Sequence, residues 1–130
     1  MTKLKSFAPQ LLVDDLQVAI TFYAQALGFR FGAPFGGFYA IGARDGFEIH
    51  LKCAPKTHAD RGHRRANQHL DIYAEVDDID ALHAHCVAYG ADIIKPLSAT
   101  NYGMRDFYLA DPDGYILAFG AAIGGYHPPD

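Results

Sequence analysis

The chain has 130 residues, enough for one domain or for two small halves that share a core. Half of the residues are hydrophobic, a fifth are charged, and the formal net charge is -4. This charge argues against a general nucleic-acid-binding protein, because neutralising phosphates requires a surplus of Lys and Arg. A neutral or cationic small molecule suits the chain better. Residues 53–66 carry four cationic side chains against one acidic side chain, a local charge of +3, and we interpret them as a solvated connector.

No segment of the sequence indicates secretion or membrane insertion. Two cysteines do not make a disulfide framework, and we expect both to be reduced. The N-terminus has two lysines but no apolar stretch after them, and the nearly apolar run at residues 115–123 is too short to cross a bilayer. We therefore expect a cytoplasmic protein with no membrane partner.

The first half of the chain predicts a strand, a helix and three further strands. Residues 7–13 are typical of a strand, and Asp14-Asp15 can cap a helix start. Apolar residues then recur at helical spacing from Leu16 to Leu27, and Gly28 ends the pattern. The three short strands that follow are expected at residues 29–31, 38–41 and 47–51.

The same order begins again in the second half. A strand is predicted at 68–76, a helix capped by Asp77-Asp78 and closed by Gly90, and strands near Ile93, at 104–110 and at 115–120. Two βαβββ modules result, at about residues 5–53 and 67–123, joined by a connector at about 54–66. The predicted fold class is α+β in one domain, with a helix on the outer face of each curved mixed sheet. Two such sheets side by side would form a cleft.

Four polar residues are the candidates for lining that cleft. Glu48 and His50 alternate with the apolar Phe47, Ile49 and Leu51, so they point to the opposite face of their strand. His69 and Asp71 share a face of the next predicted strand in the same way. We expect a hydrogen-bonded polar lining. The alternatives are a metal site built from His50, His69 and Asp71 and acid–base catalysis by His50.

Aromatic residues provide the second candidate feature. The chain has nine Phe and eight Tyr, more than its two predicted helices require for packing. Most should belong to the core. Phe38, Tyr102 and Phe107 fall near the predicted rim, where an aromatic ring can stack on a planar or cationic ligand.

The order and spacing of several motifs resemble the vicinal oxygen chelate superfamily, which groups glyoxalases, dioxygenases and bleomycin-resistance proteins. The resemblance covers nearly the whole chain. It rests on the paired helix starts Val13-Asp14-Asp15-Leu16 and Val76-Asp77-Asp78-Ile79, on residues 21–29, and on the run from Tyr102 to Tyr108 that leads into Asp111-Pro112-Asp113-Gly114. The last run is most similar to the bleomycin-resistance branch.

This resemblance implies a metal site whose ligands lie on the first and last strand of each module. The corresponding positions here are Ala8, His50, Asp71 and Ala118. A methyl group offers no lone pair, and a catalytic divalent ion usually needs about three protein ligands. We therefore expect no cofactor, with one divalent metal ion as the alternative. The resemblance also implies a homodimer.

The predicted function is a metal-free protein that sequesters an aromatic or cationic compound in an acidic, aromatic-lined cleft. Its expected contacts are Glu48, His50, His69, Asp71, Phe38, Tyr102 and Phe107. The alternative is a divalent-metal-dependent lyase, isomerase or dioxygenase. A third possibility is a protein-interaction module with a shallow groove. The sequence identifies no residue as a nucleophile.

Overall fold

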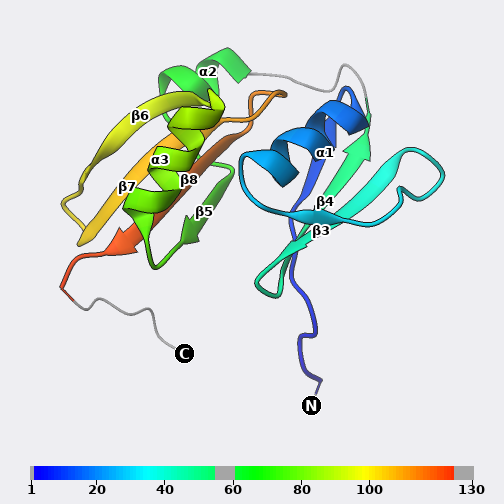
Figure 1. Cartoon of the computed structure of the whole chain (residues 1–130), viewed down its shortest axis with the longest axis horizontal. Helices are drawn as coiled ribbons and strands as arrows, with labels where there is room; N and C mark the ends of the chain where they lie inside the picture. The colour runs from blue at the N-terminus through cyan, green and yellow to red at the C-terminus, as the bar shows by residue number, and fades with distance from the viewer. Residues whose placement is uncertain (1, 55–60, 125–130) are drawn as a thin grey trace. The chain divides into compact units, whose positions relative to one another are not determined.

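The computed structural model describes residues 2–54 and 61–124 of the chain. Contacts divide the chain into an N-terminal unit, Met1–Ala59, and a C-terminal unit, Asp60–Asp130 (Figure 1). Residues 55–60, which form part of the predicted connector, lie outside the described residues. Each unit contains one four-stranded sheet, so the predicted α+β class and the pair of modules are confirmed.

The N-terminal unit has the predicted order of elements. It comprises β1 (Gln10–Val13), α1 (Leu16–Gln25), β2 (Arg30–Phe31), β3 (Tyr39–Arg44) and β4 (Phe47–Cys53). The strand order is β1-β4-β3-β2, with β1 parallel to β4 and the other pairs antiparallel. Helix α1 packs on one face of this sheet, where Leu11, Ile49 and Leu51 are buried. The alternate residues of the same strands lie on the face opposite α1.

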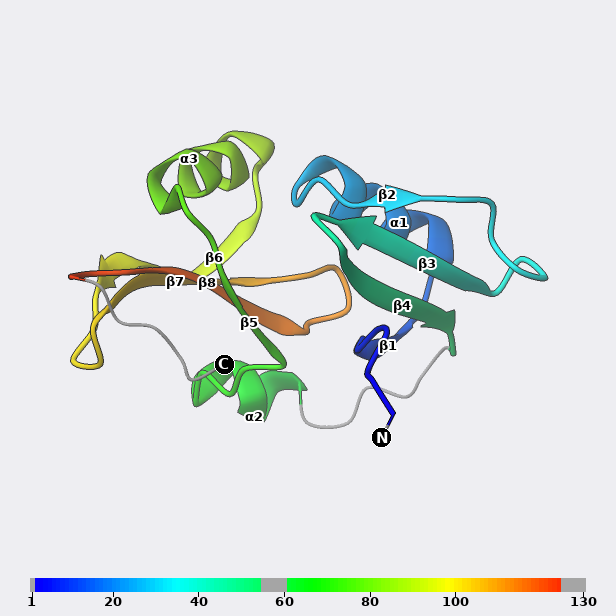
Figure 2. The same cartoon turned by 90° about the horizontal axis from the view of Figure 1, so that it is seen from below.

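The C-terminal unit repeats this arrangement after an additional helix. It comprises α2 (Arg61–Ala66), β5 (Ile72–Glu75), α3 (Ile79–Tyr89), β6 (Asp92–Ala99), β7 (Met104–Ala110) and β8 (Ile116–Ala122). The strand order β5-β8-β7-β6 matches that of the first sheet position by position. Figure 2 shows α3 on one side of this sheet, and the edge-to-face contact of His83 with Phe107, 5.0 Å between ring centroids, belongs to that side.

The two Asp-Asp pairs cap helices as predicted. Asp15 accepts a hydrogen bond from the Val18 N–H at 3.1 Å, and Asp78 accepts one from the Ala81 N–H at 3.0 Å. In both cases the second aspartate of the pair is the cap, because its side-chain oxygen reaches a donor that has no partner within the helix. Gly90 ends α3 in the left-handed conformation, with φ of 90°.

One part of the sequence interpretation is wrong: the end of the basic connector forms a helix, and the strand that follows it is shorter than predicted. Helix α2 occupies residues 61–66, and β5 begins only at Ile72. The residues between them leave the helix in a turn, since the Gln68 and His69 N–H groups donate to carbonyls of α2 and Gln68 has a φ of 53°. His69 and Asp71 therefore do not alternate along a strand.

The sequence pattern did not predict helix α2, because this helix has no apolar face. None of its residues is buried, so the periodic signal that identifies amphipathic helices is missing. Contacts of its arginines attach it to the rest of the unit. Arg64 forms an ion pair with Asp71, and Arg65 forms one with Asp92. The guanidinium carbon of Arg61 lies 4.1 Å from the centre of the Tyr115 ring. No helix among the described residues is long and apolar enough to cross a bilayer.

Candidate functional site

The face of the C-terminal sheet opposite α3 carries a pocket with a volume of about 570 Å³. Its lining residues are Tyr73 and Glu75 from β5, Met104 at the start of β7, and Tyr102 from the turn that precedes β7. Period-2 alternation places Tyr73 and Glu75 on the same face of β5. The pocket therefore combines two phenol rings, one thioether and one exposed carboxylate within a single unit.

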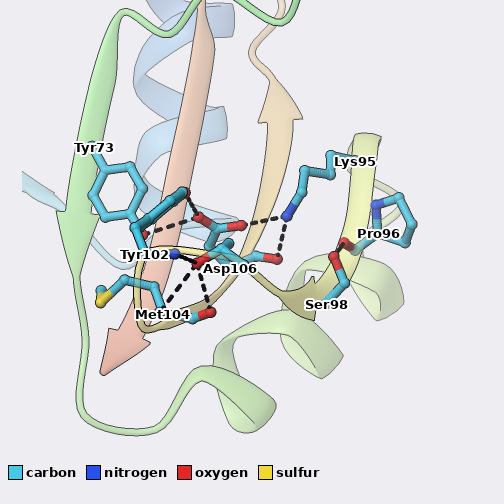
Figure 3. Close-up of polar contacts among 8 residues, drawn as sticks. Tyr73, Lys95, Pro96, Ser98, Tyr102, Met104 and Asp106 are labelled. Atoms are coloured by element: carbon cyan, nitrogen blue, oxygen red, sulfur yellow. Dashed lines mark hydrogen bonds and ion pairs between the residues drawn. The ribbon is translucent and has the colours of Figure 1, made fainter. Parts of the chain in front are cut away.

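A buried carboxylate holds the two tyrosines of this pocket in place. Asp106 on β7 is fully buried, yet its side chain meets three donors from three different segments (Figure 3). The Tyr73 hydroxyl donates to Asp106 Oδ2 at 3.0 Å, the Tyr102 hydroxyl donates to the same oxygen, and the Lys95 ammonium donates to Oδ1. A second bond joins Lys95 Nζ to the Asp106 carbonyl oxygen at 3.2 Å.

These contacts set the protonation of the cluster. Burial by itself would raise the pKa of Asp106, but the hydrogen bonds from Lys95, Tyr102 and Tyr73 outweigh it and hold this pKa below its usual value. Burial, followed by the bond to Asp106, raises the pKa of Tyr73 to about 12, and the same two causes raise the pKa of Tyr102. Asp106 is thus an anion at neutral pH and both phenols keep their protons.

The backbone of β8 makes room for this arrangement at Gly120. A methyl group at this position would overlap the Tyr73 hydroxyl oxygen and lie 3.2 Å from the Asp106 Cβ. Gly120 pairs with Glu75 on one side and Asp106 on the other. The absence of a side chain at this one position therefore lets Tyr73 lie across β8 to reach the carboxylate.

In the N-terminal unit, Glu48 and His50 lie on the sheet face opposite α1, as predicted. His50 Nδ1 is 2.7 Å from the Tyr39 hydroxyl oxygen, and His50 Nε2 is 3.5 Å from Glu48 Oε1. The Gln10 side-chain amide donates to the Tyr39 oxygen at 3.0 Å. A phenol oxygen that accepts from Gln10 can give its own proton to His50 Nδ1, which leaves the Nε2–H to face Glu48.

The other predicted site residues are distributed between the two units. Phe38 is about half exposed beside Tyr39, with 6.3 Å between ring centroids, and Tyr102 lines the pocket described above. Phe107 is fully buried on the α3 side of its sheet and leaves no surface there for a ligand. His69 is exposed and packs edge-to-face on His63 of α2.

Asp71 is occupied by structural contacts. Its Oδ1 pairs with Arg64, and its Oδ2 accepts a hydrogen bond from the Ile116 N–H at 2.9 Å. Both oxygens therefore help to attach α2 and the start of β8 to the start of β5. This use could not be foreseen from the sequence, because it depends on α2.

The residues at the metal-ligand positions implied by the resemblance do not fit a divalent ion. Ala118 is fully buried between Tyr73 and Tyr108 in the sheet, and Ala8 has no donor atom. Asp71 and His50, the two that could coordinate, already bind Arg64 and Tyr39. Among the residues that the structure describes, no group of three or more His, Cys, Asp and Glu is arranged to hold a metal.

Sequence reasoning missed Tyr73, Glu75, Met104 and Asp106. The signal for the first two was the alternation along β5, because residues 73 and 75 share one face of that strand. The signal for the other two was the alternation of β7, since Met104, Asp106 and Tyr108 occupy the face opposite Phe107. No periodic pattern in the sequence identified Gln10 and Tyr39. Their hydrogen bonds to each other and to His50 connect three different strands.

The fold and these sites define a class of protein: a pair of βαβββ modules, each with one helix-covered sheet face and one face rich in polar and aromatic side chains. The model of the Glyoxalase/Bleomycin resistance protein/Dioxygenase superfamily matches residues 3–119. The chain belongs to this superfamily. The comparison with curated proteins gave no significant match.

Several solved structures share the fold. TioX from Micromonospora sp. ML1 is 22% identical with a TM-score of 0.72, over 91% of this chain and 98% of TioX. A glyoxalase/bleomycin resistance protein/dioxygenase from Nocardioides is 19% identical with a TM-score of 0.72, over 100% of this chain and 91% of that one. Lactoylglutathione lyase from Agrobacterium tumefaciens is 16% identical with a TM-score of 0.67, over 92% and 95%. At these identities the likeness shows the fold alone.

Proposed function

We propose that this protein binds an aromatic or cationic small molecule without a metal ion, and that its main contact surface is the pocket of the C-terminal unit. The observation that carries the proposal is the composition of that pocket: the rings of Tyr73 and Tyr102 and the thioether of Met104 beside the carboxylate of Glu75. Aromatic faces attract cations and stack on planar groups. Sequestration requires shape and charge but no catalytic group.

The residues at the implied metal-ligand positions favour this proposal over metal-dependent catalysis. The superfamily includes both resistance proteins and enzymes by its own description, so membership is compatible with either. Two of the four metal-ligand positions that the resemblance implies carry Ala8 and Ala118 here. Cys53 and Cys86 form no disulfide, which is compatible with the proposed cytoplasmic location.

Ligand binding is the direct test. A panel of aromatic cations and neutral aromatics is titrated into the protein by calorimetry, with a thermal-shift screen first, because a ligand at 100 times its dissociation constant adds about 2.7 kcal/mol of stability. Glu75→Gln should weaken binding of a cationic hit about tenfold, and Tyr102→Ala should weaken it several-fold. Tyr89→Ala and Asp77→Asn are the matched controls, because both residues are exposed and lie outside the pocket. Equal losses in the controls would contradict the proposal.

The predicted contacts on the N-terminal unit are tested separately. The double variant Glu48→Gln, His50→Gln removes the acidic and the imidazole groups from the face opposite α1. Weaker binding would show that both units contact the ligand. Unchanged affinity would assign the ligand to the C-terminal pocket alone.

Metal content gives an independent check. Protein purified without a chelator should contain no stoichiometric zinc, nickel, iron or manganese by elemental analysis. A content near one ion per chain, lost in His50→Ala, would favour the metal-dependent alternative.

A second candidate function, metal-independent proton transfer, is favoured by the hydrogen-bonded chain Gln10–Tyr39–His50–Glu48. A proton taken up by the Tyr39 oxygen can be matched by release of the phenol proton to His50 Nδ1, and Glu48 then faces the imidazolium. The activated carbon acid 5-nitrobenzisoxazole is a suitable probe, since its ring opening requires only a base. A rate above buffer that His50→Asn and Tyr39→Phe both abolish would support this function, and a rate equal to buffer would exclude it for this probe.

A further inference from the structure

The pocket of the C-terminal unit has an unusual hydrogen-bonding character, which follows from the buried carboxylate beneath it. A phenol has one proton to donate. Tyr73 and Tyr102 both give that proton to Asp106 Oδ2. The two hydroxyl groups that wall the pocket can therefore offer a ligand only their oxygen lone pairs.

The remaining lining side chains offer acceptors as well. Glu75 is an exposed carboxylate, which accepts hydrogen bonds and donates none when ionised. Met104 contributes a thioether sulfur, a weak acceptor. Among the residues that the structure describes, the side chains that line the pocket thus offer a ligand acceptors and no donated proton.

Lys95, the cation of the Asp106 cluster, does not line the pocket. Its ammonium group is bound to the Asp106 carboxylate and carbonyl oxygens and lies 4.9 Å from the centre of the Tyr108 ring. Figure 3 shows Lys95 on the opposite side of Asp106 from Tyr73. The positive charge of Lys95 therefore holds the Asp106 carboxylate, and the charged residue among the described lining residues is Glu75.

We propose that the pocket selects organic cations that carry N–H donors, such as aryl amidinium, guanidinium or primary ammonium groups, and rejects carboxylates and phosphates. The inference rests on the proposed binding function and names its ligand class. A planar N–H cation can place its apolar part against the tyrosine rings and its donors on Glu75 and the phenol oxygens. A carboxylate would meet only lone pairs and a like charge, and a quaternary ammonium group would make no hydrogen bond.

The same contacts make Asp106 a positioning residue. It accepts hydrogen bonds from both tyrosine hydroxyls and so determines which way their protons point. The selectivity of the pocket therefore depends on a group that is itself fully buried.

The test compares four probes that share a phenyl ring: benzamidine, benzamide, phenyltrimethylammonium and benzoate. Their dissociation constants for the full-length protein are measured by ligand-observed NMR or calorimetry. We expect benzamidine to bind about tenfold or more tighter than benzamide and phenyltrimethylammonium, because charge-assisted hydrogen bonds are the strong ones. Benzoate should bind weakest.

Two variants separate hydrogen bonding from charge. Tyr73→Phe removes one phenol oxygen but keeps the ring, so it should weaken benzamidine several-fold and leave phenyltrimethylammonium unchanged. Glu75→Gln should weaken both cations. Tyr89→Phe, the same substitution on the exposed surface of α3, is the control and should change neither.

The outcomes distinguish this inference from the proposal on which it rests. Equal affinity for benzamidine and phenyltrimethylammonium, or preference for benzoate, would overturn the inference while leaving a small-molecule-binding protein. Failure of every aromatic probe to bind would overturn both.

Discussion

At the scale of single residues, the chain concentrates its polar chemistry on Asp106. A fully buried carboxylate is costly unless donors surround it, and here three side chains from three segments supply them. The cluster stabilises the fold and at the same time orients the two tyrosines that wall the pocket. If the pocket binds a ligand as proposed, fold stability and binding share this group, and substitutions at Asp106 should change both.

Asp106→Asn should destabilise the protein by about 3 kcal/mol at pH 7, because it leaves Lys95 partly buried without its counter-charge. The folded-state pKa of Asp106 is lowered, so its contribution is present above the unfolded value and is lost as the pH falls through the folded value. The difference between wild type and variant should therefore shrink from about pH 4 downward. Chemical denaturation at several pH values measures it.

The matched control is Asp92→Asn, which removes a carboxylate from a half-exposed pair with Arg65. Such surface pairs contribute about 0–1 kcal/mol. Two results would contradict the role of Asp106 as a buried stabilising carboxylate. One is a loss of stability in Asp106→Asn no larger than in this control, and the other is a loss that grows as the pH falls.

Gly120→Ala should displace Tyr73 from Asp106, because the added methyl overlaps the phenol oxygen. Overpacking of this kind costs about 1–3 kcal/mol. The clash is with the hydroxyl end of the ring, so the double variant Gly120→Ala, Tyr73→Phe should cost less than the sum of the single variants. Additive costs in urea denaturation would show that Gly120 is required for another reason.

At the scale of elements, local backbone signals decide where helices begin and end. Asp15 and Asp78 cap α1 and α3, and Gly90 ends α3 with a positive φ. Each of these residues acts through a contact or conformation close to it in the chain. The predicted helices are consequently found at the predicted positions, whereas α2, which depends on ion pairs with distant residues, was not anticipated.

Two glycine substitutions measure how backbone conformation contributes to the stability of the fold. A methyl group at Gly90 or at Gly62 would meet nothing within 4 Å, but only Gly90 has a positive φ. Gly90→Ala should therefore lower the free energy of unfolding by about 1–2 kcal/mol, and Gly62→Ala within α2 should raise it by about 0.5–1 kcal/mol. Thermal denaturation followed by circular dichroism compares them, and effects of equal sign would contradict this account.

At the scale of the whole molecule, α1 and α3 each lie on one face of the sheet of their own unit, among the residues that the structure describes. Several large apolar side chains are also exposed in the N-terminal unit, among them Leu4, Phe7, Phe35 and Phe47. Exposed apolar surface of this kind is typical of association sites. This surface favours self-association.

We predict a homodimer, with a mass twice the 14.2 kDa of the chain by sedimentation equilibrium at micromolar concentration. Phe7→Ser with Phe47→Ser should weaken it, because both side chains are mostly exposed within their unit. Ile123→Ser, another exposed apolar position, serves as the control. A monomeric mass for the unmodified chain would contradict the prediction.

The sequence alone was sufficient for the two modules, the capped helices and the sidedness of β4, since these depend on periodicity and on neighbours a few residues apart. It also placed Tyr102 among the candidate contacts. The roles of Asp71 and Phe107 became clear only from the tertiary structure. Arg64 forms an ion pair with Asp71, and Phe107 is buried on the side of its sheet that α3 covers. The Asp106 cluster likewise joins β5, β6 and β7 with the turn before β7, and no local pattern can reveal which buried carboxylate three separate segments will share.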